Sequence, residues 1–200
     1  LYDALKNGKI ASVTIGGTVS PAGGNFEEPV TQATLKVVGA FHGLSRERSD
    51  ARKYPAIHPI DSWSKYRGVV DMERVEQARS ILKRSNEINQ MMKVIGEEGT
   101  SAEDYIVYQK GELLDAVYLQ QNSFDPIDAA CDPDRQIHEF NVLYDVLTRD
   151  FALSDKKEIR AFFNQVRQEF LDWHNTVFRT PEFEAQEKRL KDFYLSKAAG

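Results

Sequence analysis

Few of the reactive side chains in this sequence stand at the spacing that a known chemistry requires. A phosphate-binding loop needs a glycine-rich turn followed by Lys and by a Ser or Thr that ligates Mg²⁺. Gly8-Lys9 is the nearest match, but Ile10 replaces the Ser or Thr, and Asp3 stands where the first glycine belongs. The 200 residues therefore contain no phosphate-binding loop.

Other catalytic arrangements are missing from the sequence as well. It has no nucleophile elbow, no paired histidines at helical spacing and no glycine fingerprint of a dinucleotide site. Cys131 is the single cysteine, and the four histidines are too scattered for metal ligation. The carboxylate pairs Glu97-Glu98 and Asp132/Asp134 stand at predicted caps and turns, where capping and solvation explain them. We therefore predict no catalytic residue and no metal site within these 200 residues.

Composition and charge narrow the class of protein further. Apolar residues make up 41% and charged residues 28%, which is typical of a globular domain. No apolar run approaches the roughly 20 residues of a membrane span, and no signal peptide is evident, so we expect a cytoplasmic protein without membrane insertion. Residues 1–69 hold nine Lys/Arg against six Asp/Glu (+3), and residues 70–200 hold 17 against 25 (−8). The acidic second part would repel nucleic acid.

The first 69 residues combine the signals of a strand with those of a loop. Residues 9–20 are rich in β-branched side chains and carry no charge after Lys9, which predicts a buried strand. A lone strand cannot satisfy its hydrogen bonds, and Leu1 to Lys6 read as the end of a helix. We therefore expect that the chain starts inside a larger fold and that the rest of the sheet precedes it. The prolines and paired glycines of residues 20–29 then predict a long loop.

Helical signals follow this loop. Thr31 is expected to cap a helix that Gly43 ends. Residues 54–60 contain two prolines four apart and should be extended. Beyond about Val70, apolar side chains at three-and-four spacing predict five helices, whose starts are assigned to Asp71, Ser101, Asp132-Pro133, Ser154 and Thr180-Pro181. The expected fold class is mainly α, with a C-terminal helical bundle and a small α/β part at the N-terminus.

Three segments have sequences that are specific enough to compare with a known family. Residues 20–32 read Ser-Pro-Ala-Gly-Gly-Asn-Phe-Glu-Glu-Pro-Val-Thr-Gln, residues 52–57 read Arg-Lys-Tyr-Pro-Ala-Ile, and residues 119–125 read Leu-Gln-Gln-Asn-Ser-Phe-Asp. In wording, order and spacing they resemble segments of the catalytic A subunit of V-type rotary ATPases, over essentially all 200 residues. Ala22 and Asn25 depart from the Pro and Asp that are frequent there, and residues 58–61 are closer to the F-type catalytic subunit.

This resemblance implies a domain organisation and a function. Residues 1–69 would end the P-loop nucleotide-binding domain, and residues 70–200 would form the C-terminal helical domain. The full-length subunit would bind ATP or ADP with Mg²⁺, and would couple ATP hydrolysis or synthesis to proton or sodium transport by rotation. It would lie in the headpiece, peripheral to the membrane, with a B subunit that contributes an arginine finger and a central-stalk subunit as partners. Without the phosphate-binding loop, the 200 residues alone should be inactive and should bind no nucleotide tightly.

The resemblance also assigns adenine-binding aromatics. Tyr54 and Phe124 would be the two walls of an adenine pocket, because stacking requires only flat π-surfaces and exclusion of water. Pro55 and Gln121 are weaker candidates for the same pocket. The rings should face each other about 7 Å apart, by analogy with paired aromatic geometry. The alternative is that each is a core aromatic at a domain junction.

Alternatives remain for the interaction surfaces and for the whole protein. The loops Gly96 to Thr100 and Leu153 to Lys157 are candidates for contact with the central stalk, or are simply solvated turns between helices. The chain as a whole could instead be a non-enzymatic helical adaptor, which the orphan strand at residues 9–20 argues against. It could also belong to an F-type or secretion ATPase, against which the Gly-Gly-Asn-Phe-Glu-Glu-Pro loop favours the V-type.

Overall fold

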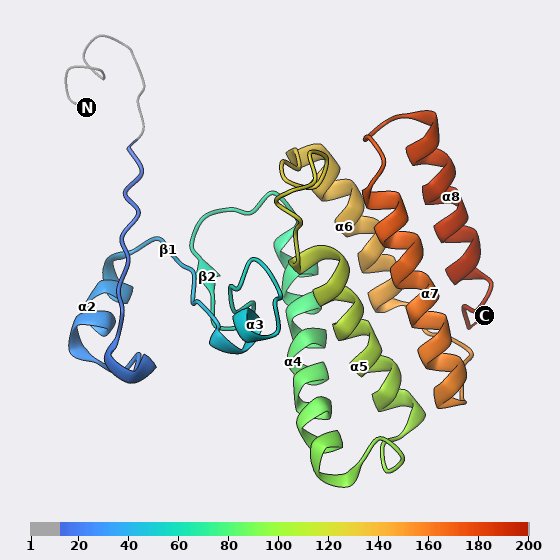
Figure 1. Cartoon of the computed structure of the whole chain (residues 1–200), viewed down its shortest axis with the longest axis horizontal. Coiled ribbons are helices and arrows are strands. Elements are labelled where there is room, and N and C mark those ends of the chain that lie inside the picture. Colours follow the sequence, from blue (N-terminus) through green and yellow to red (C-terminus); the bar gives the residue numbers. More distant parts are fainter. Residues whose placement is uncertain (1–12, 200) are drawn as a thin grey trace. The chain divides into compact units, whose positions relative to one another are not determined.

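A computed structural model describes residues 13–199 of the chain, in two units that meet at Gly39/Ala40 (Figure 1). In the first unit, residues 13–20 have no regular structure, and Val13 and Ile15 are exposed. The predicted strand is therefore wrong for residues 13–20, since no strand pairs with them among the described residues. Residues 9–12 of that strand, and the helix end expected at Leu1 to Lys6, lie outside the described residues.

The loop after residue 20 leads into α2, Pro29–Val37. It begins with a 3-10 turn in which Gly23 and Gly24 have φ angles of 63° and 76°, a region that glycine adopts without strain. Thr31 does not cap the helix, because Pro29 already opens it and Glu28 is the N-cap. Thr31 is instead buried inside the first turn, where its hydroxyl donates to the Glu28 carboxylate at 3.3 Å.

The second unit opens with a small sheet. Strand β1 (Ala40–Phe41) pairs antiparallel with β2 (Trp63–Ser64), and the Phe41 and Trp63 rings lie 6.3 Å apart. The predicted continuation of α2 to Gly43 is wrong, because the chain enters this sheet first. Helix α3 (Arg46–Asp50) and an antiparallel bridge between Leu44 and Ile57 follow, so residues 54–60 avoid helix as expected.

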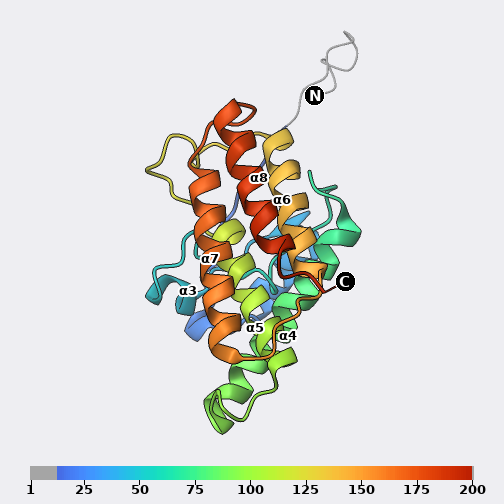
Figure 2. The same ribbon diagram turned by 90° about the vertical axis from the view of Figure 1, so that its right-hand side faces the viewer.

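The remainder is the helical bundle, which confirms the mainly α fold class (Figure 1, Figure 2). Helix α5 packs against both α4 and α7, and α7 packs against α8. A fully buried centre of aliphatic and aromatic side chains joins them, including Val146, Ile159, Val166, Phe170 and Trp173. The helices are α4 (Met72–Ile95), α5 (Ala102–Leu114) with a π-helical extension (Asp115–Leu119), α6 (Pro133–Thr148), α7 (Lys156–His174) and α8 (Pro181–Leu195).

Helix starts in the bundle follow the predicted caps with one exception. Asp71, Ser101, Asp132 and Thr180 each accept a hydrogen bond from a backbone NH of the first turn. The cap of α7 is Asp155 rather than Ser154, because the Asp155 carboxylate accepts from the Glu158 NH at 3.0 Å. Among residues 13–199, no helix is both long and apolar enough to cross a bilayer.

Two helices of the bundle approach each other closely at a glycine. Ser85 of α4 donates a hydrogen bond to the Tyr108 carbonyl of α5 at 3.1 Å. A Cβ atom on Gly111 would lie 2.2 Å from the Ser85 Oγ and 2.3 Å from its Cβ. Glycine is therefore required at this crossing, because any side chain would collide with α4.

Candidate functional site

Tyr54 and Phe124 lie in two irregular segments of the second unit. Tyr54 follows α3 and is 53% exposed, and Phe124 stands in the loop between the π-helical turn and α6 and is 95% exposed. Neither ring is buried among the described residues. Among the ring contacts of the described residues there is none between these two side chains, and their pairing across adenine stays a prediction.

The two segments are nevertheless joined through the backbone. The Gln121 NH donates to the Tyr54 carbonyl at 2.9 Å. This bond places two of the predicted site residues, Tyr54 and Gln121, side by side. Pro55 follows Tyr54 directly, through a cis peptide bond. Phe124 stands three residues after Gln121 in the same loop.

Side-chain hydrogen bonds hold the Phe124 loop in a compact turn. Asn122 Oδ1 accepts from the Phe124 NH at 3.1 Å, and Asp128 accepts from the Asn122 NH at 2.5 Å. Asp125 accepts from the NH groups of Ile127 and Asp128 at 2.7 and 3.2 Å. The Phe124 ring of this turn is exposed to solvent.

Close in sequence to the bonded residues Tyr54 and Gln121 is a cluster of three charged side chains, which the sequence did not indicate. We call the Gln121 NH to Tyr54 carbonyl bond the joint between the two segments. Asp115, the first residue of the π-helical turn, accepts from Arg48 Nη1 at 2.5 Å and from Lys53 Nζ at 2.6 Å. Arg48 and Asp115 are both buried. The partners are 67 and 62 residues apart in sequence, so no local spacing could have revealed them. Their only signal was a charged residue, Asp115, at an otherwise apolar stretch of predicted helix.

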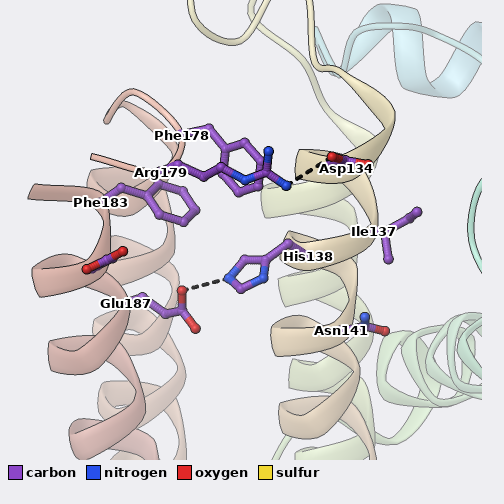
Figure 3. A pocket seen from close by; sticks show the side chains of 9 residues that line it. Asp134, Ile137, His138, Asn141, Phe178, Arg179, Phe183 and Glu187 are labelled. Carbon is purple, nitrogen blue, oxygen red and sulfur yellow. Dashed lines mark hydrogen bonds and ion pairs between the residues drawn. The ribbon is translucent and has the colours of Figure 1, made fainter. Parts of the chain in front are cut away.

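A cavity outside this region lies between α6 and α8 (Figure 3). It has a volume of about 390 Å³, and none of the predicted site residues lines it. His138 faces Glu187 across it at 2.7 Å, and Arg179 pairs with Asp134 at 2.9 Å. Burial raises the pKa of Glu187, but hydrogen bonds from Lys191 and His138 outweigh it and lower the pKa below its ordinary value. His138 and Glu187 therefore pair with each other, as do Asp134 and Arg179, and we assign the cavity no chemistry.

Both parts of the chain match families of rotary ATPase domains. Residues 2–64 match the nucleotide-binding domain of the ATP synthase alpha/beta family, and residues 72–160 match the C-terminal domain of V and A type ATP synthase. The chain is 62% identical over 193 residues to the V-type ATP synthase alpha chain of Borrelia turicatae, covering 96% of this chain and 34% of that protein. The chain is thus similar over nearly its whole length to V-type ATP synthase alpha chains.

Further relatives agree with this similarity. The V-type ATP synthase alpha chain of Borreliella burgdorferi (strain ZS7) is 61% identical over 186 residues, which is 93% of this chain and 32% of that protein. A solved ATP synthase subunit, NeqB from Nanoarcheaum equitans, shares the fold with a TM-score of 0.52 and 16% identity, over 62% of this chain and 32% of its own. The resemblance drawn from the three sequence segments is confirmed. The chain spans about a third of the length of the curated alpha chains it matches.

Proposed function

We propose that this chain is the C-terminal part of the catalytic alpha (A) subunit of a V-type ATP synthase, and that the complete subunit couples ATP hydrolysis or synthesis to ion transport by rotation. The observation that carries the proposal is 62% identity over 96% of the chain to a protein of that name. The non-enzymatic adaptor has no such support.

The reacting groups of the complete enzyme would lie outside these 200 residues. The sequence contains no phosphate-binding loop, so the phosphates, Mg²⁺ and the base that activates water are assigned to the preceding part of the subunit. The described residues gather no three His, Cys, Asp or Glu side chains that fit a metal ion.

Adenine recognition is the contribution that we propose for this chain. Tyr54 and Phe124 would stack on the base, with Pro55 and Gln121 at its edge. Three features support this: both rings are exposed, both stand on loops beside each other in the second unit, and the Gln121 NH to Tyr54 carbonyl bond joins those loops. An exposed aromatic face offers a flat apolar surface on which a base can stack. A base bound between them would exclude water from both.

The domain division at residues 69/70 and the stalk contact are further parts of the proposal. The loops at 96–100 and 153–157 meet at one end of the bundle, since Lys156 Nζ donates to the carbonyls of Glu97 and Glu98 at 2.6 and 2.9 Å. Arg160 adds an ion pair to Glu97. We assign this end of the bundle as the contact with the central-stalk subunit. A B subunit would be the second partner and would donate an arginine finger to the catalytic interface. The complex would place the chain in a cytoplasmic headpiece, peripheral to the membrane.

Calorimetric titration of the 200-residue chain tests the proposal that this chain binds adenine while the phosphates and Mg²⁺ are bound by the preceding part of the subunit. Stacking on one base contributes roughly 1 to 3 kcal/mol, whereas a millimolar complex needs about 4 kcal/mol. ATP, ADP and adenosine should therefore all bind more weakly than about 1 mM, with little difference among them. Micromolar affinity for ATP with Mg²⁺, or measurable phosphate release, would mean that these residues contain a phosphate site.

Substitutions in the full-length subunit, assembled in its complex, test the adenine site itself. Tyr54→Ala and Phe124→Ala should each raise the KM for ATP by roughly tenfold, the loss of one stacking contact. Phe178→Ala is a matched control, because Phe178 is an aromatic of the α6/α8 cavity. An unchanged KM in both site variants would exclude the proposed pocket.

A further inference from the structure

We propose that Asp115 is a positioning residue for adenine binding, which holds the Tyr54 and Gln121 segments together through a buried charge cluster. The inference rests on the proposed adenine site and adds a residue that lies beneath it rather than in it. Its basis is a set of contacts that converge on one carboxylate from both segments.

The first set of contacts reaches Asp115 from the Tyr54 side. Lys53, the residue immediately before Tyr54, brings its Nζ to 2.6 Å from Asp115 Oδ2. Arg48, in α3, brings its Nη1 to the other carboxylate oxygen at 2.5 Å. The Lys53 NH donates to the Arg48 carbonyl at 2.8 Å, so the two cations are also tied to each other. One carboxylate therefore fixes the base of the segment that carries Tyr54.

The second set reaches it from the Gln121 side. Asp115 begins the π-helical turn that leads directly into Gln120 and Gln121. Gln120 Nε2 donates to the Asp115 carbonyl at 3.3 Å, and the Gln121 NH donates to the Tyr54 carbonyl. π-Helical turns interrupt an α-helix at a cost and are frequent at functional sites. Here the turn places the Asp115 side chain under the joint while the backbone continues toward Phe124.

The charge of Asp115 is needed because Arg48 is buried. Arg48 is 9% exposed, and its Nε and Nη2 atoms have no hydrogen-bond partner among residues 13–199. Arg48, Lys53 and Asp115 all line a cleft of about 170 Å³. An uncompensated buried guanidinium would leave toward water, carrying α3 and the Tyr54 segment with it. Removal of one carboxylate charge should therefore loosen the adenine site without touching it.

Asp115→Asn in the full-length subunit, assembled in its complex, is the test. It preserves the shape of the side chain and removes the charge. We expect the KM for ATP to rise about tenfold with kcat changed by less than about threefold, because positioning of the base is lost while the phosphate chemistry is intact. The preference for ATP over GTP, measured as the ratio of kcat/KM, should fall by roughly fivefold, which general destabilisation would not cause.

Asp145→Asn is the matched control. Asp145 also bonds one Arg and one other side chain, Arg149 at 2.7 Å and the Tyr194 hydroxyl at 2.8 Å, but it lies on α6 away from both loops. Its KM and nucleotide preference should be unchanged. If Asp115→Asn behaves like this control while Tyr54→Ala raises the KM, the positioning role is refuted and the adenine site stands. If neither Tyr54→Ala nor Phe124→Ala changes the KM, the site and the positioning role fail together.

Lys53→Gln decides the matter if the Asp115 variant does not assemble. Lys53 is the more exposed arm of the cluster, so its loss leaves the Arg48 pair in place. It should raise the KM about threefold in the same direction, with the same loss of ATP preference. An unchanged KM and preference in this variant would overturn the inference.

Discussion

Residues 13–20 and helix α7 carry the same kinds of apolar side chain but bury them to opposite extents. Ile15 is 89% exposed and Ile159 is 0% exposed. Helix α7 satisfies its backbone internally and needs neighbours only for its apolar face, which α5 and α8 supply. A strand needs a neighbour for its backbone as well. The difference shows that local pattern is sufficient for a helix in this chain but not for a strand.

Matched isoleucine substitutions should give the largest contrast between these regions. Ile159→Ala removes a fully buried side chain and should lower the free energy of unfolding by about 2 to 5 kcal/mol. Ile15→Ala should change it by less than about 0.5 kcal/mol, because no packing is lost. Urea unfolding of the 200-residue chain measures both. Similar losses in the two variants would show that residues 13–20 pack on the protein in solution.

Acid should destabilise the bundle through His174. Burial, and secondly the Arg135 charge, lower the pKa of His174 from 6.5 to about 4. The unfolded chain therefore binds this proton before the folded chain does, and stability falls as pH drops from 6.5 to 4, by at most about 3 kcal/mol. Burial raises the pKa of Glu139, although Arg135 opposes this shift. Protonation of Glu139 at low pH therefore favours the folded chain and acts against the loss of stability caused by His174.

Comparison of variants isolates the histidine. His174→Gln should flatten the fall in stability between pH 6.5 and 4 relative to the unmodified chain, whereas His42→Gln, at an exposed position of the second unit, should leave it in place. Urea unfolding at a series of pH values gives the slopes. Equal slopes in all three proteins would show that His174 does not titrate this way.

Two glycines, Gly111 in the bundle and Gly17 in residues 13–20, extend the comparison to the space that is available for a side chain. Gly111→Ala places a Cβ against Ser85 and should cost about 1 to 3 kcal/mol through overpacking of α4 on α5. Gly17→Ala meets no atom within 4 Å and should be neutral within about 0.5 kcal/mol. Thermal unfolding of the two variants gives the difference. Full tolerance of alanine at Gly111 would mean that the two helices separate easily.

Helix caps should give the smallest contrast. Asp132 accepts a hydrogen bond from the Arg135 NH at 3.0 Å, so Asp132→Ala should cost about 1 kcal/mol. Glu28 is the N-cap of α2 but makes no side-chain bond to a backbone NH there, and Glu28→Ala should cost less than half as much. The two melting temperatures are the measurement, and the reverse order would contradict this account of the caps.

The bundle was predictable because its signals are local. Capping side chains and apolar spacing lie within a few residues of the helix ends they mark, and only the choice between Ser154 and Asp155 was missed. The strand prediction depended on partners that the described residues do not provide. At the candidate site, Tyr54 and Gln121 were identified through family wording, and their joint followed from the fold. The ion pairs of Asp115 could not be predicted, because they are made with two cations from a distant segment of the sequence.

The Lys156 contacts have a mechanical consequence for the bundle. The ammonium group of Lys156, the first residue of α7, donates hydrogen bonds to two successive carbonyl groups of the turn after α4. A push on that turn is therefore borne by α4, α5 and α7 in parallel, rather than by the bending of a single hairpin. The two hydrogen bonds thus tie the start of α7 to the turn that joins α4 and α5, so none of the three helices can shift at this end without breaking or moving these contacts.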